Sequence, residues 1–266
     1  MAKKKVLFIA QEIHPYVNES LVGQISKLLP QGIQTGGADI RTFMPSYGTI
    51  NARRNQLHEV IRLSGMNLVV NDKLHQLIVK VASLQPTRMQ VYFIDNDDFF
   101  ARKGTLRDKD GELYEDNAER AVFFVRGVFE TIKQLKWIPD IIHCQGWFSG
   151  LAPLYLRTHY KDDPVLSNAK IVFSAYDLTP QKPFGPELTQ VLKFDKIDHP
   201  LLNGEALDRD ALVELILTYI DGMVISTKDI SDSLIEAIHS SGKKYLDYHE
   251  PEQLVDAVRE FYKALE

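Results

Sequence analysis

Residues 6–10 read VLFIA, a continuous run of apolar side chains close to the start of the chain. An uninterrupted run of this kind is typical of a central strand in a parallel sheet, because helices cover both of its faces. Short, largely apolar runs recur at residues 40–44, 141–144, 170–175 and 223–226. Helical periodicity separates most of them, which predicts repeated strand–helix–strand units. We therefore expect an α/β fold with a doubly wound, mostly parallel, Rossmann-like sheet.

One region departs from this alternation. Within residues 56–96, segments of strand-like composition at 60–61, 66–70, 77–82 and 90–95 follow one another without a helical pattern between them. Several strands joined by short polar connections are typical of a β-rich segment rather than of strand–helix–strand units. We expect a β-rich insertion at this point of the main sheet.

The helices are predicted from apolar spacing and from their end signals. The first begins near Leu21, and Pro30 and Gly32 are expected to end or kink it. A long helix is expected to begin with Asp116 as its N-cap. Further helices are expected at residues 147–160, at 210–220, at 227–239 with Thr227 as the cap, and at 251–265. We expect one domain over residues 1–266, with the last helix packing back on it.

Composition excludes several classes of protein. The 266 residues are 44% hydrophobic and 25% charged, close to the globular average. The net charge of −5 implies no broad cationic face, so we expect no nucleic-acid partner. No stretch approaches the ~20 apolar residues of a membrane span, and the first apolar run is too short for a signal peptide. We therefore expect a cytoplasmic protein that does not associate with membranes.

Metal and cofactor signals are weak. Cys144 is the only cysteine, so neither a disulfide within the chain nor a thiolate zinc site is expected. Asp95, Asp97 and Asp98 have a spacing that matches no calcium loop. We predict no metal and no cofactor. The small basic groups at residues 53–54 and 243–244 are expected on solvated surface.

Four segments carry a family resemblance. They are residues 6–12 with Pro15 and Tyr16, residues 91–96 with Phe99 and Phe100, residues 116–120 with Phe123 and Phe124, and residues 139–144 with Trp147 and residues 150–156. In this order they resemble the bacterial glycogen synthases and plant starch synthases. Members of that family are two-domain GT-B retaining glycosyltransferases that move glucose from a nucleotide-glucose donor to an α-1,4-glucan. The chain resembles the N-terminal half of such an enzyme.

The departures from the family pattern concern the donor site. The family's Lys-Thr-Gly-Gly turn reads NESL at residues 18–21. Its His-Asp-Trp reads QGW at residues 145–147, and its Ile-His-Asn reads AYD at residues 175–177. A Thr-Gly-Gly does occur at residues 35–37, where the end of the first helix is the natural interpretation. The family's second domain is expected to be missing as well.

The candidate ligand site lies in the loops that follow the strands, since sheets of this class bind ligands at the carboxyl ends of their strands. His14 and Tyr16 follow the first strand, and Asn18 lies where the family has its lysine turn. Asp95 and Asn96 end a later strand. The resemblance implies that this region faces the acceptor glucan.

Three further candidates each have a structural alternative. His143 matches a family histidine, but a histidine at this place can equally be buried and satisfied by its neighbours. Asp116 is either a site carboxylate or a helix cap. Trp147 either stacks on a sugar ring or belongs to the core. No residue is assigned a catalytic role.

Three functional hypotheses follow from the resemblance. The first is an active synthase that works alone. The second, which the lost donor motifs favour, is a glucan- or small-molecule-binding or regulatory protein without autonomous transferase activity, because a departing diphosphate needs cations or helix N-termini. The third is a transferase half that completes its site with a partner chain or as a homodimer. The resemblance implies an α-glucan or a nucleotide sugar as the ligand.

Overall fold

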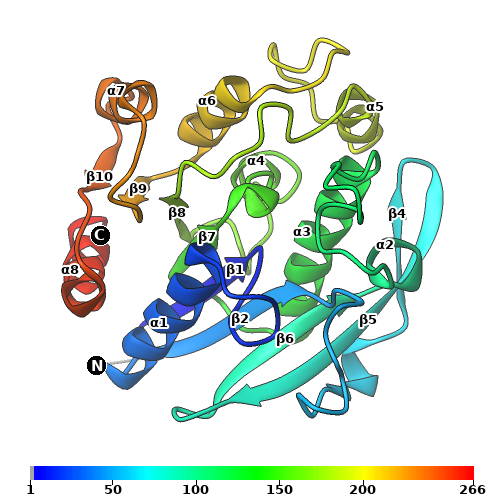
Figure 1. Ribbon diagram of the computed structural model, residues 1–266, viewed down its shortest axis with the longest axis horizontal. Coiled ribbons are helices and arrows are strands. Elements are labelled where there is room, and N and C mark those ends of the chain that lie inside the picture. Colours follow the sequence, from blue (N-terminus) through cyan, green and yellow to red (C-terminus); the bar gives the residue numbers. More distant parts are fainter. Residues whose placement is uncertain (1–2) are drawn as a thin grey trace.

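A computed structural model describes residues 3–266, and its centre is a ten-stranded sheet (Figure 1). Nine strands follow the order β10-β9-β8-β7-β1-β2-β6-β5-β3, and β4 pairs with β5 off this path. Strands β10 to β6 in this order pair in parallel. Their bounds are β1 Lys5–Ala10, β2 Asp39–Pro45, β6 Met89–Asp95, β7 Ile141–Gln145, β8 Lys170–Ala175, β9 Gly222–Ile225 and β10 Lys244–Leu246. The predicted α/β class with a mostly parallel sheet is therefore confirmed.

The β-rich insertion is also present. Strand β5 (Lys73–Leu84) pairs antiparallel with β6, with β3 (His58–Glu59) and with β4 (Met66–Val70). This long strand joins the insertion to the parallel sheet through β6. In Figure 1 the insertion forms the cyan part of the molecule beside α3.

Helices cover both faces of the parallel part. Helix α1 (Leu21–Thr35) packs against α8 (Pro251–Ala264) on one face. On the other face, successive contacts join α5, α3, α4, α6 and α7 (Figure 1). Their bounds are α3 Asn117–Gln134, α4 Ala152–Arg157, α5 Glu187–Phe194, α6 Arg209–Tyr219 and α7 Asp232–Ser240, and the single-turn α2 is Asp97–Phe100.

Of the two outcomes expected at Pro30 and Gly32, an end or a kink of the first helix, the end is wrong. Helix α1 continues to Thr35 with Pro30 inside it. Gly32 instead marks a close approach, because a Cβ there would lie 2.5 Å from Cγ2 of Val255 on α8. Packing against the sheet and against α8 outweighs the main-chain hydrogen bond that a proline removes.

Two other helix boundaries also differ. The helix expected at 147–160 is divided into a 3₁₀ turn, Trp147–Ser149, and α4, with Pro153 in the first turn of α4. The helix expected from Thr227 begins at Asp232 with Ser231 as its N-cap residue. The Ser231 N–H is held by Asp177 from the loop after β8, at 2.8 Å. A contact remote in sequence therefore places this helix start.

Smaller differences concern short elements. Residues 60–61 were expected as a strand, but the two-residue β3 precedes them and a 3₁₀ turn, Ile61–Leu63, follows. Helix α5 and strand β10 have no counterpart among the predicted elements. Within residues 3–266, no helix has the length and apolar character needed to cross a bilayer.

Candidate functional site

A narrow crevice of about 80 Å³ lies at the carboxyl ends of β1, β7 and β8. Glu12 from the β1–α1 loop, Trp147 after β7, and Tyr176 and Asp177 after β8 line it. The crevice is thus where a parallel sheet of this class binds ligands. It combines two carboxylates, a phenol and an indole, a set that can bond to hydroxyl groups and pack against a sugar ring.

The floor of the crevice is a buried hydrogen-bond network around the end of β7. Gln145 Oε1 accepts a bond from the hydroxyl of Ser26 on α1 at 2.5 Å, and the phenol of Tyr176 lies 3.4 Å from it. Gly146 has φ +84°, and a Cβ there would lie 2.7 Å from Cβ of Gln11. Only glycine therefore lets β7 turn beside β1 at this point.

The start of α1 is closed by the chain itself. Ser20 is the N-cap, and its Oγ accepts the N–H of Gly23 at 2.9 Å. The same hydroxyl donates to the carboxylate of Glu12. Burial raises the pKa of Glu12, and the Ser20 hydrogen bond partly offsets the rise. One main-chain donor that an anion would use at this helix N-terminus is therefore taken, and a carboxyl group lies beside it.

On the other side of the β1–α1 loop lies a larger, polar hollow of about 630 Å³, here called the basic hollow. One wall is the β1–α1 loop, with Glu12, Tyr16 and Asn18. The opposite wall consists of residues 49–55 and 103–107. Tyr16 and Asn18, both predicted site residues, thus line this hollow. The ring of Tyr16 packs edge-on against Phe93 at 4.9 Å.

The segment 116–120, which carries part of the family resemblance, holds the loop that follows α2. Asp116 forms a two-pronged ion pair with Arg102, at 2.7 and 2.5 Å. Asn117 donates to the carbonyl of Leu106 at 3.0 Å. Arg120, fully buried, donates to the carbonyls of Phe99 and Thr105 and to Asn117 Oδ1, at 2.8, 2.7 and 2.6 Å. Asp116 occupies the N-cap position of α3, as predicted, but its side chain makes no capping hydrogen bond and pairs with Arg102 instead.

Asp95 and Asn96 are both buried at the end of β6. Asp95 pairs with Lys80 of β5 at 2.5 Å. Burial raises the pKa of Asp95, and the Lys80 ammonium partly offsets the rise. Asn96 caps α2 through the N–H of Phe99 and donates to the carbonyl of Gln76 at 3.0 Å. Both side chains therefore join the insertion to the main sheet.

His143 is completely buried in β7. Its Nδ1 lies 2.6 Å from the hydroxyl of Tyr262 on α8, and its Nε2 lies 2.9 Å from Oγ of Ser174 on β8. Burial lowers the pKa of His143 to about 3. Both ring nitrogens thus have partners inside the protein. This is the arrangement expected of a buried histidine that is satisfied by its neighbours.

The remaining predicted residues lie at the carboxyl edge. Trp147 lines the crevice and packs edge-on against Phe148 and Phe184. His14 is half-buried, and its main-chain N–H donates to the carbonyl of Gly23 at 3.0 Å. His14 therefore lies against the start of α1.

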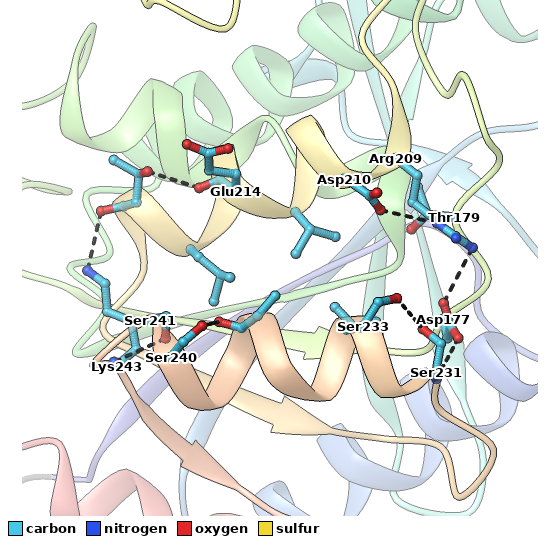
Figure 2. A pocket seen from close by; sticks show the side chains of 15 residues that line it. Asp177, Thr179, Arg209, Asp210, Glu214, Ser231, Ser233, Ser240, Ser241 and Lys243 are labelled. Carbon is cyan, nitrogen blue, oxygen red and sulfur yellow. Dashed lines mark hydrogen bonds and ion pairs between the residues drawn. The ribbon is translucent and has the colours of Figure 1, made fainter.

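A groove of about 540 Å³ runs between α6 and α7 and adjoins the crevice (Figure 2). Arg209, Asp177 and Ser231 lie at one end of it, and Lys243 lies at the other. Its walls and those of the crevice have four residues in common, namely Asp177, Thr179, Val213 and Leu234. A ligand too long for the crevice can therefore extend along the two helices.

Comparison with known proteins gives the family. A family model described as the starch synthase catalytic domain matches residues 5–221. The chain belongs to the starch synthase catalytic-domain family. The glycogen synthase of Chlorobium limicola is 39% identical over 175 residues, covering 65% of this chain and 36% of that protein. The glycogen synthase of Chlorobaculum parvum is 38% identical over 187 residues, covering 70% of this chain and 38% of that protein.

A solved structure supports the same fold. The catalytic domain of starch synthase IV from Arabidopsis thaliana, bound to ADP and acarbose, matches with a TM-score of 0.74 and 18% identity. The match covers 92% of this chain and 51% of that one. This chain thus spans little more than a third of the curated relatives' length and about half of the starch synthase IV chain.

Several residues of this starch synthase-family site were not predicted from sequence. Glu12 had a usable signal, because it follows the first strand directly. Tyr176 and Asp177 lie where the family has its Ile-His-Asn, which also marked them. Ser20 had a local signal as the serine that precedes the first helix, whereas the role of Gln145 depends on its contact with Ser26 of α1.

Proposed function

We propose that this chain binds a linear α-glucan, or a similar neutral sugar, at the crevice and does not transfer glucose on its own. The observation that carries the proposal is the closed start of α1, where Ser20 takes the N–H of Gly23 and contacts Glu12. The family's phosphate-binding turn belongs at this place. The chain has replaced it with a carboxyl group and an internal cap.

The electrostatic consequence is specific. Glucosyl transfer from a nucleotide sugar releases a diphosphate, whose charge must be stabilised as it forms. A single such donor is worth roughly 2.7–4 kcal/mol to the transition state. Here Glu12 and Glu19 lie beside the helix start, so a diphosphate would meet negative charge rather than a lysine.

A neutral sugar suits the same surroundings. The carboxyl groups of Glu12 and Asp177 and the phenol of Tyr176 can accept or donate hydrogen bonds to sugar hydroxyls, and Trp147 offers an apolar face. The adjoining α6–α7 groove gives a chain of glucose units a path away from the crevice. The Arabidopsis starch synthase IV structure holds acarbose as well as ADP, which supports a sugar ligand for this fold.

The test is calorimetric titration of the whole chain with maltoheptaose, ADP and ADP-glucose, together with an assay for labelled glucose transferred to glycogen. We expect maltoheptaose to bind and no labelled glucose to be transferred from ADP-glucose. Glu12→Gln should weaken maltoheptaose binding about tenfold, since it removes a charged acceptor. Transfer by the wild-type chain alone would contradict the proposal.

Two variants test the closed helix start directly. The double variant Glu12→Gln/Ser20→Ala frees the N–H of Gly23 and removes the neighbouring charge, so it should gain measurable ADP affinity. Glu252→Gln with Ser83→Ala changes the same residue types at exposed positions outside the crevice, the groove and the basic hollow, and is the matched control. If the control gains ADP affinity equally, the helix start is not what excludes the nucleotide.

The alternative function is an active synthase that completes its site with a second copy or a partner chain. One observation favours it: three cations, Arg54, Lys103 and Arg107, line the basic hollow at the same sheet edge. A second copy predicts a transfer rate that rises with the square of the chain concentration. A rate that stays at background over a hundredfold range of concentration would exclude that form of the alternative.

A further inference from the structure

The charges of the basic hollow are divided between its walls. Arg54, Lys103 and Arg107 lie on the wall formed by residues 49–55 and 103–107, and Glu12 and Glu19 lie on the β1–α1 wall. Within residues 3–266, none of the three cations forms an ion pair with a carboxylate. The chain as a whole carries a net charge of −5. Three unneutralised cations on one wall therefore form a local concentration of positive charge.

Two of these cations stand on a fixed loop. Arg120 and Asn117 of α3 hold the carbonyls of Thr105 and Leu106, which lie between Lys103 and Arg107. A Cβ at Gly104 would lie 1.9 Å from the carbonyl oxygen of Arg107, so the loop closes tightly on itself. The positions of the two cations are thus set before a ligand arrives, which lowers the entropic cost of binding.

The main chain of Arg54 and the guanidinium of Arg107 are also held by hydrogen bonds. Arg107 Nη1 donates to the carbonyl of Gly111 at 2.7 Å, which leaves its other N–H groups available. Arg54 belongs to a turn in which its main-chain N–H donates to Oδ1 of Asn51 at 2.8 Å. Guanidinium groups bind phosphate oxygens with two parallel hydrogen bonds, which a single ammonium cannot do.

The opposite wall suits hydroxyl groups. Glu12, Asn18 and Glu19 present oxygen acceptors and an amide, and Tyr16 lies beside them. An anion placed against this wall would be repelled by the carboxylates, whereas sugar hydroxyls can donate to them. A volume of about 630 Å³ is within the range of small-molecule sites.

We propose that the basic hollow binds a sugar phosphate, with its phosphate on Arg54, Lys103 and Arg107 and its hydroxyls toward Glu12 and Glu19. The site adjoins the crevice proposed for neutral glucan, and Glu12 lines both. The shared chemistry is a phosphomonoester on a hexose, which can be a free sugar phosphate or a phosphorylated residue of a glucan. This second ligand goes beyond the proposed function and does not depend on it.

The experiment is calorimetric titration of the whole chain with glucose 6-phosphate, inorganic phosphate and glucose in separate runs. We expect glucose 6-phosphate to bind at least tenfold more tightly than either of the other two, because only it reaches both walls. A maltooligosaccharide phosphorylated at one C6 hydroxyl is the fourth probe. If it binds more tightly than glucose 6-phosphate, a phosphorylated glucan is the source of the ligand, and the reverse order identifies a free sugar phosphate.

Variants locate the binding. Arg107→Gln and Lys103→Gln should each weaken glucose 6-phosphate binding about tenfold, which corresponds to the loss of a charge-assisted hydrogen bond. Lys109→Gln removes the same charge from an exposed position nearby, outside the set of residues that line the hollow, and should leave the affinity unchanged. Circular dichroism melting of each variant checks that the fold is intact.

Three outcomes would overturn the proposal. The first is that glucose 6-phosphate gives no heat of binding. The second is that Lys109→Gln and Arg107→Gln lose the same amount of affinity for glucose 6-phosphate. The third is equal affinity for inorganic phosphate and glucose 6-phosphate, which would mean that the sugar does not contribute to binding. Maltoheptaose is titrated in parallel into the same variants. Because maltoheptaose reports on the crevice, failure of the glucan proposal and failure of this one are distinguished.

Discussion

Two buried polar networks, one around His143 and one around Arg120, lie in the same sheet-and-helix core but differ in what they hold. The ring of His143 is placed between Tyr262 and Ser174, and all three groups are enclosed under α8. Arg120 instead bonds to main-chain carbonyls of residues 99 and 105. The first network joins elements inside the core, whereas the second fixes a loop that reaches the surface.

The difference shows why a residue type is a poor guide to a site. His143 is the type of residue that chemistry uses most often, yet both of its ring nitrogens are bound inside the protein. Arg120 does not line the basic hollow itself, but it bonds to the carbonyl of Thr105 in the wall and so positions Lys103 and Arg107 on either side. A segment that carries the family resemblance, 116–120, thus serves as scaffold for this wall.

The largest effect is expected from Arg120→Met. The substitution leaves the carbonyls of Phe99 and Thr105 without their buried donor, so the free energy of unfolding should fall by about 3–5 kcal/mol. Urea unfolding followed by circular dichroism measures it. Arg53→Met, at an exposed arginine, is the matched control and should change stability by less than about 0.5 kcal/mol.

A second variant keeps the Arg120 comparison informative if the methionine variant does not fold. Arg120→Lys retains the charge but cannot bond to three acceptors in the same plane, so it should fold with intermediate stability. Hydrogen exchange should then rise in residues 99–107 and stay unchanged around His143. Equal loosening of both regions would show that the two networks are not independent.

The His143 network is expected to give a pH effect of intermediate size. The pKa of His143 is lowered to about 3 in the folded protein, against about 6.5 when unfolded. Because the unfolded chain binds the proton more readily, the contribution of neutral His143 to the free energy of unfolding is complete above pH 6.5. It is lost as the pH falls toward 3. Stability should therefore fall by about 2 kcal/mol from this residue between pH 7 and pH 5.

The measurement for His143 is its imidazole chemical shift, titrated in the intact protein, together with urea unfolding at pH 7 and pH 5. The ring should stay neutral down to pH 4. His58→Asn, at an exposed histidine, should leave the pH slope of stability unchanged relative to the wild type. A His143 titration midpoint near pH 6 would mean that the core around it opens to water.

The smallest effect is expected from Tyr262→Phe, which removes only the hydroxyl that contacts His143 Nδ1. One buried hydrogen bond is lost and the ring still fills its space, so the unfolding free energy should fall by about 1 kcal/mol. Tyr245→Phe, at a partly exposed tyrosine of β10, should change it by less than about 0.5 kcal/mol. If Tyr262→Phe lowered the unfolding free energy more than Arg120→Met, the His143 network would contribute more to stability than the Arg120 network.

Much of the fold could be predicted from the sequence because strands of a parallel sheet are specified locally. The run at residues 170–175 coincides with β8, and the first apolar run lies within β1. An uninterrupted apolar segment has few other stable placements, since both of its faces must be covered. The site was less predictable, because its residues come from separate loops.

Particular residues show where local signals fail. Pro30 looked like a helix end, but α8 packs on the far turn of α1 and keeps it helical. Asp116 looked like a cap, but Arg102, fourteen residues earlier, takes its carboxylate. In each case the deciding partner is remote in sequence, so no periodicity within a window of residues reports it.

The amino-acid sequence by itself determined the α/β class, the places of most strands along the chain and the family motifs, because apolar periodicity and turn residues act over a few neighbouring positions. Only the tertiary structure decided that Ser20 and Glu12 close the start of α1, that His143 is enclosed by Tyr262, and that Lys103 and Arg107 share a hollow with Arg54. These arrangements depend on how helices pack across the sheet. Hydrogen-bond partners and charge neighbours are set by that packing rather than by any one segment.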